Sequence, residues 1–162
     1  MDSAAKEAQS RLKWVNHRLL TTVLIYTGTD SFIYAACGFA GSTLPDYLEG
    51  RPPKESKAYW KWRSRHRCTT HWTVPYLTAI LALMVLHQQS ILDGFAWEGA
   101  KLLIFVCAGA LLHILEDGIC GKVPLISRTG KIGIRLLKVG SAWEYLFTCM
   151  ACLAALYYKF SP

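Results

Sequence analysis

The sequence predicts an all-α integral membrane protein, a bundle of about five helices in a single domain covering residues 1–162. Hydrophobic residues make up 52% of the chain, and they gather in long apolar stretches. A membrane-spanning helix needs about 20 mostly apolar residues. Four stretches approach that length, alone or with their flanks: 19–44, 74–92, 102–115 and 145–158. The alternative that composition leaves open is a soluble all-α bundle with a very apolar core.

The first apolar stretch contains a break at residues 28–31, where a flexible glycine precedes Asp30 and residues typical of helix caps. An unbroken helix from His17 to Asp46 would be about 43 Å long at 1.5 Å per residue, so these two side chains could not share a site. A hairpin at the break returns Asp46 to the side of His17, and we therefore expect the first two helices to pair. The expected helices are 11–27, 31–44, 73–92, 98–117 and 142–159.

The charged residues give a partly independent indication of orientation. The net charge is +7, and in this topology 16 of the 18 Lys and Arg residues lie on the face that carries His17 and Asp46. The positive-inside rule places that face in the cytoplasm of a bacterial-type inner (plasma) membrane, which the chain crosses several times. Tryptophans at the starts of the expected helices suit the membrane interface: Trp14, Trp72, Trp97 and Trp143.

A basic segment, residues 54–67, follows the second expected helix and contains Trp60 and Trp62. Its attachment to membrane helices at both ends favours contact with anionic lipid over nucleic acid, and no nucleic-acid partner is expected. The first 18 residues show no cleavage site after a short apolar core, so we expect no cleaved signal peptide. The cysteines show no disulfide framework, and the CxxC of Cys149 and Cys152 lies in an apolar stretch, away from the usual context of a redox pair.

Histidines and carboxylates stand at the edges of the apolar stretches. Ionisable groups at such positions are costly in a membrane and mark a functional site by default. Imidazole and carboxylate groups together suit a hydrolytic metal such as zinc. The hairpin topology brings the candidates to one face of the membrane: His17, Asp46, Glu49, His66, His71, His113, Asp117 and Glu144.

Local spacing ranks some of these side chains. His113 and Asp117 are four residues apart and share one helix face, whereas Glu116 points about 100° away from Asp117 and ranks below it. Asp46 and Glu49 are three apart and become neighbours if a helical turn forms there.

The two histidines before the third expected helix are five residues apart, so one straight helix would splay them. Pro75 favours the first turn of that helix, which leaves His66 and His71 on a loop that can aim both rings inward. His87 lies at the opposite edge and is expected to be a polar helix-end residue without a catalytic role.

Several motifs follow one another in a fixed order: His17, Leu-Pro-Asp at 44–46, His-Arg-x-x-Thr-His at 66–71, His-x-x-x-Asp at 113–117, Gly-Lys-Val-Pro-Leu at 121–125 and Gly-Ser-x-x-Glu at 140–144. With these motifs, residues 13–146 resemble the YdjM-like membrane-bound metal-dependent hydrolases, which are distantly similar to zinc-dependent phospholipase C. The chain departs from that family at Leu48, where Asp is common, and at Trp72, where Ser is frequent. Glu49 is the carboxylate available to replace the missing Asp.

The resemblance implies hydrolysis of a phosphoester by a metal-activated water near the cytoplasmic leaflet, with a phospholipid as one candidate substrate. It implies a divalent metal, foremost zinc, as one to three ions bound by His17, Asp46, Glu49, His66, His71, His113 and Asp117. Its candidate catalytic carboxylates are Glu49, Asp117 and Glu144. A basic loop supplies candidate phosphate-binding residues, although positive-inside topology explains their charge equally well: Arg128, Lys131 and Arg135.

Other functions stay open at the level of sequence. In one, the same residues hold a structural metal in a non-catalytic membrane component whose basic face binds a partner. A transporter or channel subunit is disfavoured, because the helices are few and no inverted repeat is visible. The sequence is compatible with an oligomer.

Overall fold

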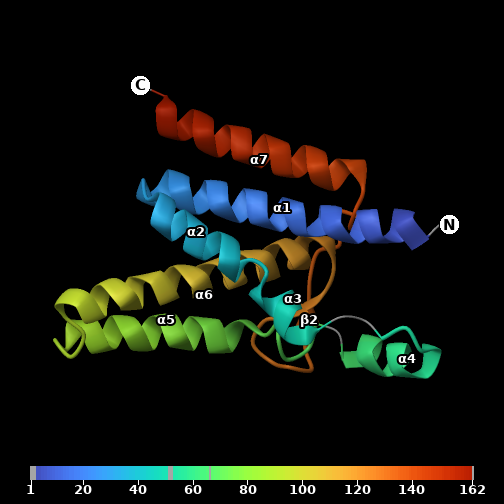
Figure 1. Ribbon diagram of the computed structural model, residues 1–162, viewed down its shortest axis with the longest axis horizontal. Coiled ribbons are helices and arrows are strands. Elements are labelled where there is room, and N and C mark those ends of the chain that lie inside the picture. Colours follow the sequence, from blue (N-terminus) through green and yellow to red (C-terminus); the bar gives the residue numbers. More distant parts are fainter. Residues whose placement is uncertain (1–2, 51–52, 66, 162) are drawn as a thin grey trace.

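The computed structural model describes residues 3–50, 53–65 and 67–161, most of which are helical (Figure 1). Its principal helices are α1 (Ser3–Thr29), α2 (Phe32–Gly41), α5 (Thr73–Gln88), α6 (Gly94–Cys120) and α7 (Ala142–Phe160). The prediction of an all-α fold is confirmed. Each expected helix has a counterpart, although α1 and α6 begin earlier, and α2 and α5 end earlier, than the apolar pattern indicated.

The principal helices run roughly along one direction (Figure 1). α5 and α6 pack against each other, α2 lies between α6 and α1, and α7 packs on α1. The connection between α5 and α6 lies at one end of this bundle, as does the C-terminal end of α7 (Figure 1). The opposite end carries the short helix α3 (Leu44–Glu49), the start of α7 and the end of α6.

The turn between α1 and α2 lies where the sequence predicted a break. Asp30 adopts a left-handed backbone conformation with φ of 57°, and the chain turns there after the end of α1. The Ser31 hydroxyl then accepts a hydrogen bond from the Tyr34 N–H at 3.3 Å and caps α2. α2 stops at Gly41, earlier than expected, because Pro45 lies in the first turn of a separate helix, α3.

Glycines allow α2 and α6 to approach closely. A Cβ atom added at Gly109 would lie 2.2 Å from the backbone oxygen of Gly38, and one at Gly41 would lie 2.0 Å from that of Val106. Small residues at such crossings let two helix backbones meet, as in many membrane helix pairs. This contact fixes the position of α6 relative to the first hairpin.

Some elements have no counterpart in the sequence prediction. Helix α4 (Ser56–Arg65) forms within the basic segment, and strands β1 (Val123–Pro124) and β2 (Lys131–Ile132) form an antiparallel ribbon after α6. The chain after β2 returns to the end of α6, where the Ile134 N–H donates to the Gly118 carbonyl at 2.9 Å. The ribbon and its loop therefore cover the end of α6 that carries the candidate site.

Within the described residues, α6 is the one helix long and apolar enough to cross a membrane; α5 is apolar but shorter. The expectation of several membrane crossings is therefore not supported by helix length and composition. α1 carries many polar residues along its length, and α2 has only 10 residues. The main buried apolar cluster is small and lies between α5, α6 and β1: Tyr76, Cys107, Ala110, Ile114 and Val123.

Candidate metal centre

Three elements distant in sequence bring one potential metal ligand each to the same place. Asp46 lies in the first turn of α3, His71 precedes α5, and His113 lies in the last third of α6. The loop that carries His71 is held by the Tyr76 hydroxyl, which donates to the Thr70 carbonyl at 2.9 Å. The sequence predicted these three residues, among others, on one face of the membrane, and the structure brings the three together.

The ligand atoms of this group all lie within 4.8 Å of one another, so the group could hold a metal ion. Nε2 of His71 is 3.4 Å from Nε2 of His113 and 3.3 Å from Oδ1 of Asp46. Nε2 of His113 is 3.7 Å from the same Asp46 oxygen. We call Asp46, His71 and His113 the three-ligand group.

Burial and hydrogen bonding shape the protonation of this group. Burial alone would lower the pKa of His71, but its hydrogen bonds to the carboxylates of Asp117 and Asp46 raise that pKa to about 9. Burial alone would raise the pKa of Asp46, but hydrogen bonds from His113 and His71 hold it well below its usual range. In the absence of a metal, a proton on His71 therefore balances part of the negative charge.

Asp117 borders the three-ligand group on the α6 side. It lies one helical turn beyond His113, as the spacing predicted, and is almost fully buried. Its Oδ2 is 3.4 Å from Nε2 of His71 and 3.8 Å from Nε2 of His113. His17 approaches from α1, with its ring centroid 4.4 Å from that of His113 and its Nε2 3.8 Å from Oδ1 of Asp117.

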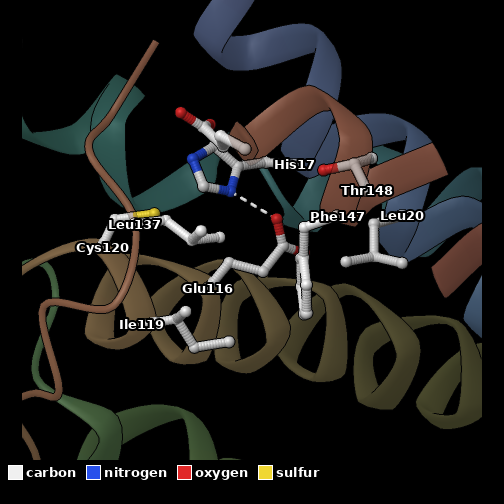
Figure 2. A pocket seen from close by; sticks show the side chains of 9 residues that line it. His17, Leu20, Glu116, Ile119, Cys120, Leu137, Phe147 and Thr148 are labelled. Atoms are coloured by element: carbon white, nitrogen blue, oxygen red, sulfur yellow. Dashed lines mark hydrogen bonds and ion pairs between the residues drawn. The ribbon is translucent and has the colours of Figure 1, made fainter. Parts of the chain in front are cut away.

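Glu116 belongs to this site, although residue spacing along the helix ranked it below Asp117. Its Oε2 lies 2.6 Å from Nδ1 of His17, and Figure 2 shows the two side chains pointing toward each other across a small pocket. Glu116 points away from Asp117 around α6, and that direction is where α1 packs. The contact depends on the packing of α1 against α6, which residue spacing along α6 alone does not indicate.

The other two candidate carboxylates have defined partners. Glu49 lies with its Oε2 3.8 Å from Nδ1 of His71. Glu144 is buried at the start of α7, where it accepts hydrogen bonds from Nδ2 of Asn16 at 3.2 Å and from the Gly140 N–H. The Ser141 hydroxyl accepts in turn from the Glu144 N–H, so Glu144 takes part in a cap of α7. It also lines the pocket beside His17, and its catalytic role stays a prediction.

The structure gives a position for the predicted phosphate-binding residues but not for one of the predicted metal ligands. His66 lies outside the described residues. Arg128 has its guanidinium over the ring of Trp72, 4.7 Å from the centroid, while Lys131 is in β2 and Arg135 is exposed with φ of 56°. Their proposed contact with phosphate stays a prediction.

Arg67 also reaches the site, a contact that the sequence did not predict. Its Nη2 donates to Oδ1 of Asp117 at 2.7 Å. The signal that could have found it is its place inside the His-Arg-x-x-Thr-His motif, between two candidate ligands.

His87 lies near the far end of α5, away from the three-ligand group. Its ring stacks on Trp97 with centroids 3.8 Å apart, and its Nδ1 lies 2.8 Å from the Leu92 carbonyl. This placement agrees with the polar helix-end role expected from the sequence.

Comparison of the chain with protein-family models, with curated proteins and with solved structures gives no match.

Proposed function

We propose that this protein is a membrane-bound metal-dependent hydrolase that cleaves a phosphoester, with a phospholipid as a candidate substrate. The observation that carries the proposal is the three-ligand group, in which two histidines and an aspartate from separate elements converge. The resemblance of the motif order to YdjM-like membrane-bound hydrolases supports the same function.

Zinc suits the donor atoms of the group. Ligand atoms about 2.0–2.1 Å from a tetrahedral zinc ion lie about 3.3–3.4 Å from one another. The separations from Nε2 of His71 to Nε2 of His113 and to Oδ1 of Asp46 are 3.4 and 3.3 Å. Small shifts of His113 would bring the third separation, now 3.7 Å, into the same range. Nitrogen and carboxylate donors without thiolate are typical of catalytic zinc sites.

The chain's own groups have separable roles in hydrolysis. A bound divalent metal supplies an acidified water and positive charge near the phosphoryl oxygens. Oδ2 of Asp117 lies 3.4 Å from Nε2 of His71 and 3.8 Å from Nε2 of His113, where it would be placed to accept a proton when a metal is bound. Glu116 holds the His17 ring through Nδ1, which leaves Nε2 facing Asp117. His17 is thus placed to bind a further metal ion or to pass on a proton.

Membrane attachment is supported by the surface of the helices. Large hydrophobic side chains are exposed along α5 and α7, and a soluble monomer rarely exposes such long apolar faces. We propose that lipid covers them, with the basic residues near the site end facing the cytoplasm of an inner membrane. The exposed residues on these two helices include Leu77, Leu81, Met84, Val85, Leu146, Met150, Leu153 and Tyr157.

A non-catalytic membrane component with a structural metal is the second candidate. The observation that favours it is burial: His71, His113 and Asp117 are each no more than 2% exposed. A structural zinc site is closed by protein ligands, whereas a catalytic one keeps a position for water. X-ray absorption on the zinc-loaded protein separates the two, since an oxygen ligand from water is expected only in the catalytic case.

The proposal is tested by replacing one ligand. The protein is purified in detergent, and its metal content and its hydrolysis of phospholipid and of a soluble phosphodiester are measured. His113→Ala should lose both the metal and the activity, because it removes one of three converging donors. His87→Ala, a histidine change at the far end of α5, should keep both. A metal-free wild-type protein, or a His113→Ala protein that keeps metal and activity, would contradict the proposal.

A further inference from the structure

We infer that Arg67 is the phosphate-binding residue of the centre, an inference that rests on the proposed function. Its Nη2 donates to Oδ1 of Asp117 at 2.7 Å, while Oδ2 of the same carboxylate faces His71 and His113. The guanidinium is therefore separated from the three-ligand group by a single carboxylate. Arginine suits phosphate because its planar group presents several N–H donors to two oxygens at once.

The backbone of Arg67 is held in a conformation that non-glycine residues rarely adopt. Its φ is 55°, in the left-handed region, and its N–H donates to Oε1 of Glu49 at 2.8 Å. Such strained positions persist where surrounding structure holds them, and they cluster at functional sites. Here the turn directs the side chain to Asp117 rather than along the end of α4.

The fold also leaves room for the guanidinium. A Cβ atom added at Gly121 would lie 2.7 Å from Nη1 of Arg67. Gly121 follows the end of α6 as its C-cap, with φ of −153° and ψ of −147°. Glycine at this position makes room for Nη1 of Arg67, and a side chain there would displace the guanidinium.

Donors of Arg67 remain for a ligand. Nε of Arg67 is buried and has no hydrogen-bond partner among the described residues, a costly condition that an oxygen of a ligand can relieve. The side chain is 20% exposed, so part of it is open to the solvent.

The negative charge around the centre favours a further cation beside an anionic substrate. Carboxylates of Asp46, Asp117, Glu49 and Glu116 lie around the three-ligand group. They repel a phosphoester, and one divalent ion offsets only part of their charge. Arg67, in direct contact with Asp117, adds the positive charge next to the metal.

The test compares binding of inorganic phosphate and hydrolysis of charged and uncharged esters in the zinc-loaded, full-length protein. Arg67→Ala should weaken phosphate binding about tenfold or more, in line with the loss of charge-assisted hydrogen bonds. It should slow a phosphodiester far more than an uncharged carboxylic ester. Arg67→Lys should recover part of both losses, and Gly121→Ala should weaken phosphate binding with every charge retained.

Zinc content, measured for each variant, distinguishes phosphate binding from a purely structural role. Lys57→Ala, which removes an exposed lysine of α4, should leave phosphate binding unchanged. The inference is overturned if Arg67→Ala loses zinc, if it slows both esters equally, or if Arg128→Ala loses phosphate binding and Arg67→Ala does not. A wild-type protein that binds no zinc refutes the proposed function and the inference together, whereas a zinc-loaded, active protein insensitive to Arg67→Ala refutes only the inference.

Discussion

At the scale of single residues, proton sharing between His71 and its carboxylate neighbours makes the metal-free protein sensitive to pH. The pKa of His71 in the folded protein is about 9, above the ordinary value of 6.5, so the proton on its ring stabilises the folded state. Asp46 acts at the other end of the range, because its pKa is held below the ordinary value of 3.8. The two shifts predict greatest stability between these ordinary values.

We therefore expect the thermal unfolding midpoint of the metal-free protein to fall as the pH rises from 6.5 to 9. The contribution of His71 is fully present below 6.5 and is lost as its ring deprotonates in the folded state. The measurement is thermal unfolding in detergent with a chelator. In the control variant His71→Gln, the unfolding midpoint should change less over this pH interval. Zinc should stabilise the protein more near pH 9 than near pH 6.5, because zinc binds the neutral ring of His71. A midpoint that rises over the interval would show that His71 does not carry the proton.

Residue spacing could predict part of the site. The separation of His113 and Asp117 by four residues placed both on one face of a helix, and that is local geometry. The contacts of Glu116 with His17 and of Arg67 with Asp117 join residues 99 and 50 positions apart. They depend on how α1 and the loop after α4 approach α6, and no local pattern carries that information.

At the scale of elements, the crossing of α2 and α6 is the contact most sensitive to added volume. Gly38 and Gly109 bring the two backbones together, and α6 carries His113 one turn beyond Gly109. A change in this crossing therefore moves a ligand as well as a helix.

Gly109→Ala should lower the stability by about 1–3 kcal/mol, the usual cost of overpacking. The added methyl group would meet the backbone of Gly38, which cannot move aside as a side chain would. Gly99→Ala is the matched control in the same helix, because a Cβ there has no heavy atom within 4 Å. It should leave the stability unchanged or raise it by up to about 1 kcal/mol through helix propensity. Equal unfolding midpoints for the two variants would argue against the close crossing.

Element boundaries were predictable where cap residues mark them. The break before α2 follows from a glycine, Asp30 and a capping serine, whose backbone preferences act locally. The separation of α3 from α2 was missed, because an apolar run continues to Leu44 and hides the end of α2 at Gly41. The strands β1 and β2 have two residues each, too few to produce an alternating pattern.

At the scale of the whole molecule, the bundle has two chemically different ends. The three-ligand group lies at the end that carries α3. The α5–α6 connection, which contains Asp93, lies at the other end (Figure 1). If the proposed membrane orientation is correct, the two ends face different compartments.

Cysteine labelling should report that orientation. In a variant without the native cysteines, Ser127→Cys in the basic loop should react with a membrane-impermeant maleimide only in inverted vesicles. Ser90→Cys, between α5 and α6, should react in cells with the outer membrane permeabilised. Both positions are exposed, so burial does not explain a difference. Reaction of both from one side would contradict the proposed crossings, and a protein recovered in the soluble fraction would contradict membrane attachment.

The convergence of Asp46, His71 and His113 has a consequence for the chain as a polymer. A metal ion shared by these ligands acts as a cross-link that closes successive loops, the second of which joins residues 42 positions apart. Loop closure restricts the unfolded chain, and ligands brought together only by folding make metal binding part of the folding equilibrium. Chelation would then free α3, the loop before α5 and the end of α6 from one another at the same time, so a metal bound there would also hold these parts of the fold together.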